Sequence, residues 1–405
     1  MSAVVMSHPT GNANVRAVLA ALDDSHLLDT FYTTVGVRAD NGLTPLLPEK
    51  LRAQVRKREY AARNARMVFH PHKELLRLLG RTSIDAVYRD LDRFVASQLG
   101  ARNGAIGGVY CYEDGALETF RAAQRRGLVC FYDLPIAYWE TARQLLREEA
   151  ERLPQWEPTL IGTRDPEAKL QRKTQELELA DVVFVPSRFV EESLPSGIRK
   201  NKQVVLAEFG SPSVGRFPPE RRQNSGGALR VLFAGSLTQR KGLADVFAAM
   251  KLLGRSDVEL VVMGSPVAPL EFYRREFPGF RYEPPRPHAQ VLELMRSCDV
   301  FVLPSLVEGR ALVQQEAMAC GLPLIVTPNA GGEDLIDEGR TGFLVPIRSP
   351  ASIAEKVAWF ADHRDALPAF SAAARAEAAC HTWEGYGTKV VRAVAKTLRR
   401  TEVAL

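Results

Sequence analysis

Short runs of β-branched and other apolar residues alternate along the chain with longer amphipathic stretches. This alternation is typical of β–α–β units built around parallel sheets. In the first half of the chain the apolar runs predict strands at 3–6, 109–112, 128–132, 182–185 and 203–207. In the second half they predict strands at 230–234, 259–263, 300–303 and 324–327. We therefore expect an α/β fold with parallel sheets.

The length of 405 residues exceeds that of one ordinary domain, so two domains are expected. The segment 223–227 follows a proline-rich stretch at 216–219 and lacks any apolar period, which predicts an interdomain linker. The N-terminal domain then spans 1–222, and the C-terminal domain begins at 228. Hydrophobic residues make up 46% and charged residues 25% of the chain, as in a globular protein, and no apolar run is long enough to span a bilayer.

The cysteines and the net charge bear on the cellular compartment and on the binding partners that are expected. The five cysteines are scattered and form no Cys-x-x-Cys pair, which favours a reduced, cytoplasmic compartment. Residues 1–6 lack the features of a secretory leader and predict the first buried strand. The net charge of +5 is modest for this length and does not indicate nucleic-acid binding.

The basic residues are concentrated between Lys50 and Arg81, where ten of them face only Glu59 and Glu74. Leucines and aromatic residues are interleaved with them, which is the composition of an amphipathic surface on anionic lipid. A solvated pair of helices is the other interpretation. The ten basic residues are Lys50, Arg52, Arg56, Lys57, Arg58, Arg63, Arg66, Lys73, Arg77 and Arg81.

Two glutamates follow the apolar run that ends at Pro304-Ser305. Glu308 lies in the turn, and Glu316 lies in a helix-like segment that runs to Gly321, before another apolar run begins at Pro323. Ligands bind beyond the carboxyl ends of strands in open parallel sheets, so Glu308 is expected in a crevice with Glu316 a turn or two into the helix. Two carboxylates there suit the hydroxyls of a sugar and a ribose.

An anion site is predicted after the strand at 230–234. Gly235 follows the strand, and Arg240, Lys241 and Gly242 precede a helix. Glycines let a diphosphate approach the backbone, the helix N-terminus offers unpaired amides, and two cations complete the site. An exposed cationic turn is the alternative for this segment alone.

Together with segments 181–187, 329–332, 339–345 and 382–384, these features resemble glycosyltransferase family 4, also called glycosyl transferases group 1. The resemblance covers about residues 180 to 390. It implies the GT-B fold, in which two Rossmann-like domains face each other across a cleft, the N-terminal one binding the acceptor and the C-terminal one, 228–382, a nucleotide diphosphate sugar. It also implies a last helix at 383–405 that crosses back to the N-terminal domain.

The resemblance also implies roles for individual residues. Arg240 and Lys241 would grip the donor diphosphate, Glu316 would bind the ribose, and Glu308 would bind hydroxyls of the transferred sugar. Arg240, Lys241 and Glu308 are thus the expected catalytic group, with no metal or redox cofactor. The other donor-binding residues that it implies are Gly11, Gly235, Gly264, Gly309, Arg310, Ala311 and Leu312.

Several positions depart from the family pattern. Arg310 and Ala311 stand where relatives have Phe-Gly, so the guanidinium would either recognise the sugar or point to solvent. The first loop, 7–14, is poor in glycine and contains His8, which is expected on the acceptor side. Where relatives usually place a histidine, this chain has polar residues that are either acceptor-side groups or strand-end caps. They are Glu113, Asp114 and Asp133.

Three other motifs have structural interpretations. Asp90 and Asp92 form an Asp-x-Asp pair, but they lie in a helix-like run at 83–98 and not at a strand end. His70 and His72 have no third metal ligand near them in sequence. The glycines at 104–108 lack the spacing of a dinucleotide fingerprint.

The expected function is retaining transfer of a sugar from a nucleotide diphosphate sugar to a glycan, glycolipid or envelope-polysaccharide acceptor. If the segment 50–81 contacts anionic lipid, the protein would lie on the inner face of the cell membrane. Two alternatives stay open: an epimerase or inverting transferase of the same fold, and a catalytically silent GT-B subunit that binds a partner.

Overall fold

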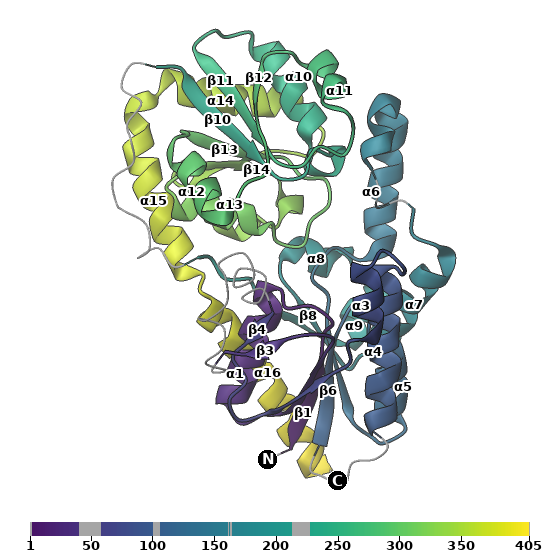
Figure 1. Cartoon of the computed structure of the whole chain (residues 1–405). Helices are drawn as coiled ribbons and strands as arrows, with labels where there is room; N and C mark the ends of the chain where they lie inside the picture. The colour runs from purple at the N-terminus through teal and green to yellow at the C-terminus, as the bar shows by residue number, and fades with distance from the viewer. Residues whose placement is uncertain are drawn as a thin grey trace, which may run out of the picture.

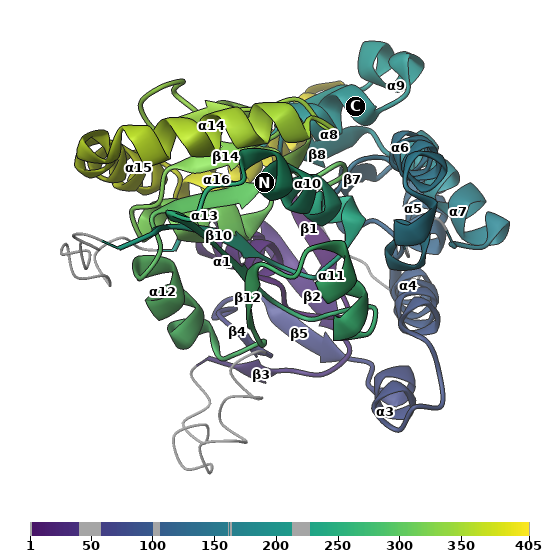
Figure 2. The same ribbon diagram turned by 90° about the horizontal axis from the view of Figure 1, so that it is seen from above.

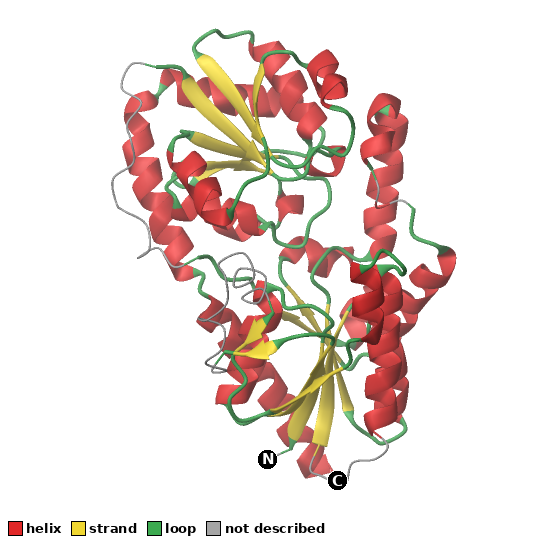
Figure 3. Ribbon diagram, in the orientation of Figure 1, coloured by secondary structure: helices red, strands yellow, loops and turns green. Residues whose placement is uncertain are grey.

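The computed structural model describes residues 2–39, 58–99, 106–160, 162, 164–212 and 227–404 (Figure 1). The proline-rich stretch at 216–219, most of the predicted linker, residues 223–226, and residues 50–57 of the basic segment lie outside the described residues. The described parts form two α/β domains, each with a parallel sheet and helices on both of its faces (Figure 3). Within the described ranges, no helix combines the length and apolar character that crossing a bilayer requires.

The N-terminal sheet has seven parallel strands in the order β5-β2-β1-β6-β7-β8-β9. Its strands are β1 (Ala3–Ser7), β2 (Leu28–Thr33), β5 (Arg66–Phe69), β6 (Ile106–Tyr112), β7 (Val129–Asp133), β8 (Val182–Val185) and β9 (Gln203–Leu206), and a separate short pair joins β3 (Val37–Arg38) to β4 (Glu59–Tyr60). Its helices are α1 (Ala13–Asp24), α3 (His72–Leu78), α4 (Ile84–Leu99), α5 (Leu117–Gln124), α6 (Trp139–Arg152), η2 (Pro154–Thr159), α7 (Glu167–Leu179), α8 (Arg188–Ser193) and α9 (Ser196–Asn201).

The C-terminal sheet has six parallel strands in the order β12-β11-β10-β13-β14-β15. The strands are β10 (Leu229–Ala234), β11 (Val258–Met263), β12 (Phe280–Glu283), β13 (Val300–Leu303), β14 (Leu324–Val326) and β15 (Gly342–Leu344). The helices are η5 (Gln239–Lys241), α10 (Leu243–Leu253), α11 (Leu270–Glu276), α12 (His288–Arg296), α13 (Leu312–Ala319), η6 (Pro328–Ala330), η7 (Glu333–Leu335), α14 (Pro350–Asp362), η8 (Arg364–Ala366) and α15 (Leu367–Cys380). The central strands are buried on both faces, which is why they read as continuous apolar runs.

The last helix, α16 (Trp383–Ala404), returns from the C-terminal domain to the N-terminal one and packs on α1 (Figure 1). Val390 and Val394 of this helix are fully buried in the N-terminal core. Gly387 allows the close approach, because an added Cβ would lie 2.6 Å from the Cβ of Ala21. Two parallel sheets and a returning helix confirm the predicted fold, GT-B.

The described part of the basic segment, residues 58–81, differs from a pair of solvated helices. Residues 66–69 form β5, an edge strand paired with β2, and within this described part only His72–Leu78 are helical. Arg58 lies inside this region and its guanidinium pairs with Glu74 at 2.5 Å while donating to the carbonyl of Pro9 at 2.9 Å. Part of the positive charge therefore holds the domain together.

The helix α6 and the 3-10 helix η2 lie between the two domains. The N-terminal end of α6 packs on α7 through Trp139, whose Nε1 donates to Thr174 Oγ1 at 3.1 Å. Both views place the two helices side by side (Figures 1 and 2). The far end reaches the C-terminal domain, where Trp156 of η2 is buried in the core. Residues 139–159 precede the predicted linker in sequence but contact both domains.

Candidate functional site

The predicted anion loop begins where β10 and β11 end in glycines that approach each other closely. Gly235 has φ 149° and Gly264 has φ 145°, and a Cβ added to Gly264 would lie 1.8 Å from the Gly235 carbonyl oxygen. Gly242, between η5 and α10, has φ 77°, and its added Cβ would lie 2.2 Å from the carbonyl oxygen of Pro304. Side chains are thus excluded at the points where this loop meets its neighbours.

Arg240, Lys241 and Glu308 come together as the sequence predicts. Lys241 Nζ lies 2.5 Å and Arg240 NH1 2.9 Å from the same oxygen, Glu308 Oε1. Arg240 NH1 also donates to the carbonyl of Val307 at 2.7 Å. Burial raises the pKa of the Glu308 carboxyl, but Lys241 and Arg240 outweigh this and hold that pKa below its usual value.

The backbone of the Glu308-Gly309 turn is held by the N-terminal domain. Ser187 Oγ, after β8, donates to the Gly309 carbonyl at 2.6 Å, and Ala137 N donates to the Glu308 carbonyl at 3.4 Å. A Cβ added to Gly309 would lie 1.7 Å from the Pro135 carbonyl oxygen. The carboxyl ends of the two sheets therefore meet at this turn.

Arg310 does not point to solvent. The residue is 3% exposed, its guanidinium pairs with Asp334, and its Nε donates to Gln315 Oε1 at 3.2 Å. The guanidinium thus fixes the entry to α13 from inside the domain. Next to it, Ala311 N donates to the carbonyl of Ala330 at 3.1 Å, and Leu312 packs against the N-terminal core.

Glu316 lies on α13, bonded to a different partner from Glu308. Its Oε1 is 2.9 Å from Nε2 of His288, at the start of α12, and its side chain is 22% exposed. Burial raises the pKa of the Glu316 carboxyl, and His288 opposes this only in part. The pairing with His288 was not predicted, because the two residues lie on different helices with no shared motif.

The first loop of the N-terminal domain places His8 in an aromatic enclosure. The ring is 4% exposed, packs edge-on against Tyr88 and Tyr112, and bonds through Nδ1 to the carbonyl of Thr10. Burial lowers the pKa of His8 to about 4. Gly11 follows in contact with Tyr60, whose hydroxyl would lie 2.9 Å from an added Cβ.

Glu113 and Asp114 follow β6 and face the cations of α7. Glu113 is buried and pairs with Lys173 Nζ at 3.0 Å. Asp114 has φ 74°, and its carboxylate lies 3.5 Å from both Lys169 and Arg172. Both carboxylates therefore belong to an ion-pair network at the carboxyl edge of the sheet.

Asp133 lies inside the N-terminal domain at the end of β7. The residue is 2% exposed, and its Oδ2 accepts hydrogen bonds from Tyr110 at 2.7 Å and from Tyr386 of α16 at 3.2 Å. Burial raises the pKa of the Asp133 carboxyl to about 7, against the two hydroxyl donors, which lower it. The structure thus ties this carboxyl to the returning helix.

The other motifs have structural roles. Asp92 accepts from the backbone amides of Glu118 and Thr119 at 2.8 and 2.9 Å and so caps α5. Asp90 bonds to His70, which stacks on Phe94. Among the side chains that the structure describes, no three His, Cys, Asp or Glu residues gather as a metal ion would require.

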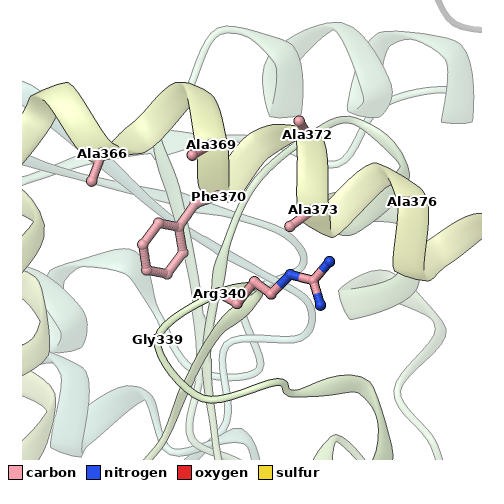
Figure 4. Close-up of a pocket in the computed structure, with 8 residues that line it drawn as sticks. All are labelled: Gly339, Arg340, Ala366, Ala369, Phe370, Ala372, Ala373 and Ala376. Atoms are coloured by element: carbon pink, nitrogen blue, oxygen red, sulfur yellow. The ribbon is translucent and has the colours of Figure 1, made fainter.

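A pocket of ≈ 440 Å³ lies between the loop at Gly339-Arg340 and the alanine-rich face of α15 (Figure 4). Phe370 and the Arg340 side chain border it, and its other lining residues are small. None of these residues belongs to the predicted site. Its lining offers a single charged group, so it is not a site for a diphosphate.

Two parallel-sheet domains, a returning helix and an Arg-Lys-Glu cluster at the carboxyl ends of the C-terminal strands define a GT-B protein. Residues 228–363 match the family of glycosyl transferases group 1. This match lies within the C-terminal domain.

Curated relatives match part of this chain in sequence, and solved structures match its fold. The D-inositol 3-phosphate glycosyltransferase of Corynebacterium urealyticum is 25% identical over 252 residues, which are 56% of this chain and 59% of that protein. Sucrose-phosphate synthase of Thermosynechococcus elongatus has a similar fold with a TM-score of 0.67 and 18% identity over 99% of this chain and 100% of that one. Anabaena HepE, solved in complex with UDP-glucose, gives a TM-score of 0.62 with 14% identity over 98% of this chain and 100% of that one. Matches to two curated relatives span 34% and 59% of their lengths.

Proposed function

We propose that the protein transfers a glycosyl group from a nucleoside diphosphate sugar to an acceptor hydroxyl, with retention of the anomeric configuration. The observation that carries this proposal is the convergence of Arg240 and Lys241 on one oxygen of Glu308. Two positive charges face one negative charge, so the cluster keeps a net positive charge for a diphosphate. The family of residues 228–363 and the UDP-glucose complex of HepE support a nucleotide sugar as donor.

The proposed chemistry relies on the leaving diphosphate. As the glycosidic bond breaks, negative charge grows on the phosphate oxygen, and Arg240, Lys241 and the first amides of α10 would stabilise it. Glu308 would then exchange its contacts with the two cations for hydroxyls of the transferred sugar. Since the leaving phosphate takes the acceptor proton on the same face, this reaction needs no separate base.

The N-terminal domain supports retention over an inverting or epimerising reaction, which would need a positioned base. Glu113 is paired with Lys173, and Asp133 is enclosed by two tyrosines. His8 is enclosed by Tyr88 and Tyr112, and burial lowers the pKa of its imidazole to about 4, which makes it a weak base. Each candidate base is thus already engaged.

A lipid-linked acceptor is the second part of the proposal. The surface formed by α3 and its neighbours, here called the α3 surface, exposes four large apolar side chains and Arg81. Leu78 and Leu79 are 65% and 68% exposed, and Phe69 and Leu75 are 43% and 51% exposed. Isolated exposed leucines are ordinary, but a cluster beside basic residues suits an anionic membrane. An acceptor held by that membrane would approach the N-terminal domain.

The deciding experiment begins with a thermal-shift screen of the purified protein against UDP, GDP, ADP, dTDP and their common sugars. A ligand that binds only the folded state at roughly a hundred times its Kd adds about 2.7 kcal/mol of stability. The best donor is then incubated with candidate acceptors, and proton NMR reads the anomer of the product. Inversion would contradict retention, and donor binding without transfer or hydrolysis would favour the silent-subunit alternative.

A further inference from the structure

The segment formed by α6 and η2 (residues 139–159), here called the arm, is anchored in the C-terminal domain by Trp156. This side chain is 1% exposed and packs edge-on against Phe272 and Phe247. Its Nε1 donates to Glu276 Oε2 at 3.2 Å. The anchor brings the end of η2 against the loop that contains Arg240 and Lys241.

Gln239, the residue before Arg240, is fully buried, and its side chain and backbone N–H make four hydrogen bonds, two of them to the arm. Its backbone N–H donates to Thr159 Oγ1 at 3.1 Å, and its Nε2 donates to Glu149 Oε1 at 2.6 Å. The other two stay within the C-terminal domain: Nε2 donates to Asp245 Oδ2 at 2.8 Å, and Oε1 accepts from Ala244 N at 2.7 Å. The donors and acceptors of this side chain are all used, which fixes its orientation.

The negative charges of the two carboxylates beside Gln239 are balanced by arginines, with ion pairs that cross the interface between the arm and the C-terminal domain. Glu149 of the arm and Asp245 of α10 are 0% and 1% exposed. Arg152 donates to both, at 2.6 Å and 2.8 Å, and Arg348, which lies between β15 and α14 of the C-terminal domain, donates to Glu149 at 2.8 Å. Buried carboxylates are tolerated only with such partners, so the network allows one arrangement of arm and loop.

We propose that the arm is a working part of the nucleoside diphosphate site, with Thr159 and Gln239 as positioning residues. Their hydrogen bonds hold the backbone at 238–241, so that the side chains of Arg240 and Lys241 reach the position that the Glu308 carboxylate occupies in this structure. The segment that binds the diphosphate is then shaped by residues that precede the linker. This inference rests on the proposed function, and it adds that diphosphate affinity depends on residues outside the C-terminal sequence.

Thr159→Val tests the proposal, because it removes the hydroxyl that accepts from Gln239 N while keeping the shape of the side chain. Thr159→Ser restores the hydroxyl, and Thr159→Ala serves if the valine variant folds poorly. Thr341→Val is the matched control: this residue is also buried in the C-terminal domain, and its hydroxyl accepts from Asp337 N at 2.8 Å, away from the loop.

Two measurements separate the arm's role from the proposed function. Hydrogen exchange of residues 236–242 in the free protein reports loop order without any ligand. Calorimetric titration with inorganic pyrophosphate reports the anion site without a nucleobase. We expect Thr159→Val to speed loop exchange and weaken pyrophosphate binding roughly fivefold, Thr159→Ser to restore both, and Thr341→Val to change neither despite a similar loss of melting temperature.

Each outcome has a distinct meaning. Loop exchange that is the same in wild type and Thr159→Val would overturn the arm's positioning role. Faster exchange with unchanged pyrophosphate affinity would overturn its link to the anion site, and so would a wild-type protein that binds no pyrophosphate. If pyrophosphate binds as expected but none of UDP, GDP, ADP and dTDP does, the proposed function fails while the arm's effect on the loop stands.

Discussion

At the scale of single residues, the two cations of the anion loop differ in how firmly they are held. Lys241 is 11% exposed and Arg240 26% exposed at the side chain, and both share Glu308. We expect Arg240→Ala and Lys241→Ala each to weaken nucleoside diphosphate binding about tenfold to a hundredfold, since a charged hydrogen bond contributes ~1.5 to 3 kcal/mol. Calorimetry checks this, with Arg255→Ala, which removes a surface arginine of the same domain, as the control. Unchanged affinity in both variants would remove the diphosphate from this loop.

Glu316 and Glu308 are expected to have different roles, one in nucleotide binding and the other in turnover. Glu316→Ala should weaken binding of the free nucleoside diphosphate, because it removes a ribose acceptor. Glu308→Ala should leave that binding intact or stronger, because it frees Arg240 and Lys241 from their carboxylate, but it should lower turnover. Binding and initial rates are measured on both variants. Equal losses of free nucleotide affinity would contradict the division.

Asp133 gives a prediction about pH. Its pKa in the folded protein is about 7, above the usual value of 3.8, so the stability associated with the protonated form is complete below pH 4 and is lost as pH rises through 7. Asp133→Asn keeps an acceptor for Tyr110 and Tyr386 without the charge. We expect it to be more stable than wild type by up to about 4 kcal/mol above pH 8 and close to it near pH 4.

Urea unfolding at several pH values measures this difference. The opposite effect of His8, whose pKa is lowered to about 4, occurs in both proteins and therefore cancels. A difference in stability that does not grow between pH 4 and pH 8 would mean that burial does not raise the pKa of Asp133. Loss of transfer activity with gained stability would instead support its acceptor-side role.

At the scale of elements, sequence periodicity found the strands that are buried on both faces. All nine predicted strands occur, with ends shifted by at most three residues. The missed strands β5, β12 and β15 lie at sheet edges; β12 (Phe-Arg-Tyr-Glu) alternates apolar with charged residues, β5 begins with Arg66, and β15 has three residues. The missed β2 is internal, but its sequence Leu-Asp-Thr-Phe-Tyr-Thr mixes polar residues into a buried strand.

Only the parts of the site that lie in recognisable sequence motifs could be predicted from the sequence. The family resemblance groups Arg240, Lys241 and Glu308, and the structure brings them together because their loops follow β10 and β13, which are paired neighbours. The contacts of Arg310 with Asp334 and His381 join residues far apart in sequence, and no spacing predicts them. The arm was missed for the same reason, although a lone tryptophan between prolines at 154–158 is an unusual composition for a surface turn.

The α3 surface allows a prediction about an element. Residues 56 and 57 lie outside the described part of the chain and Arg58 is structural, so the informative variants are Leu78→Ser with Leu79→Ser, and Arg81→Gln. We expect the double variant to lose binding to vesicles that contain phosphatidylglycerol, since burying an exposed leucine contributes ~1.5 to 3 kcal/mol. Arg81→Gln should weaken binding roughly fivefold and reduce its salt dependence.

Leu252→Ser is the matched control for the vesicle experiment, because Leu252 is 65% exposed on the C-terminal domain. Co-sedimentation at low and high salt measures the binding. Equal losses in Leu252→Ser and the double variant would mean that the α3 surface is not the contact. Wild-type protein that stays in the supernatant at low salt would make a soluble acceptor the better hypothesis.

At the scale of the whole molecule, the described connections between the domains are built into both cores. The helix α16 inserts Tyr386 into the N-terminal domain, and the arm inserts Trp156 into the C-terminal one. The Glu308-Gly309 turn adds direct contacts with Ser187 and Pro135 at the point where the sheets meet. Each domain thus depends on a segment whose neighbours in sequence belong to the other, so we expect the protein to unfold as one unit.

Trp156→Ala should uncouple the two domains. Removing a buried tryptophan costs ~3 to 5 kcal/mol in the C-terminal core and detaches the arm from it, so the C-terminal domain should unfold first. In wild type, unfolding curves followed by circular dichroism and by intrinsic fluorescence should coincide, and in Trp156→Ala they should separate into two transitions. Trp359→Ala is the control, because Trp359 packs on Phe343 and Phe360, both within the C-terminal domain. Trp359→Ala should lower the unfolding midpoint while the two curves still coincide.

Coincident curves in Trp156→Ala would show that the arm does not couple the unfolding of the two domains.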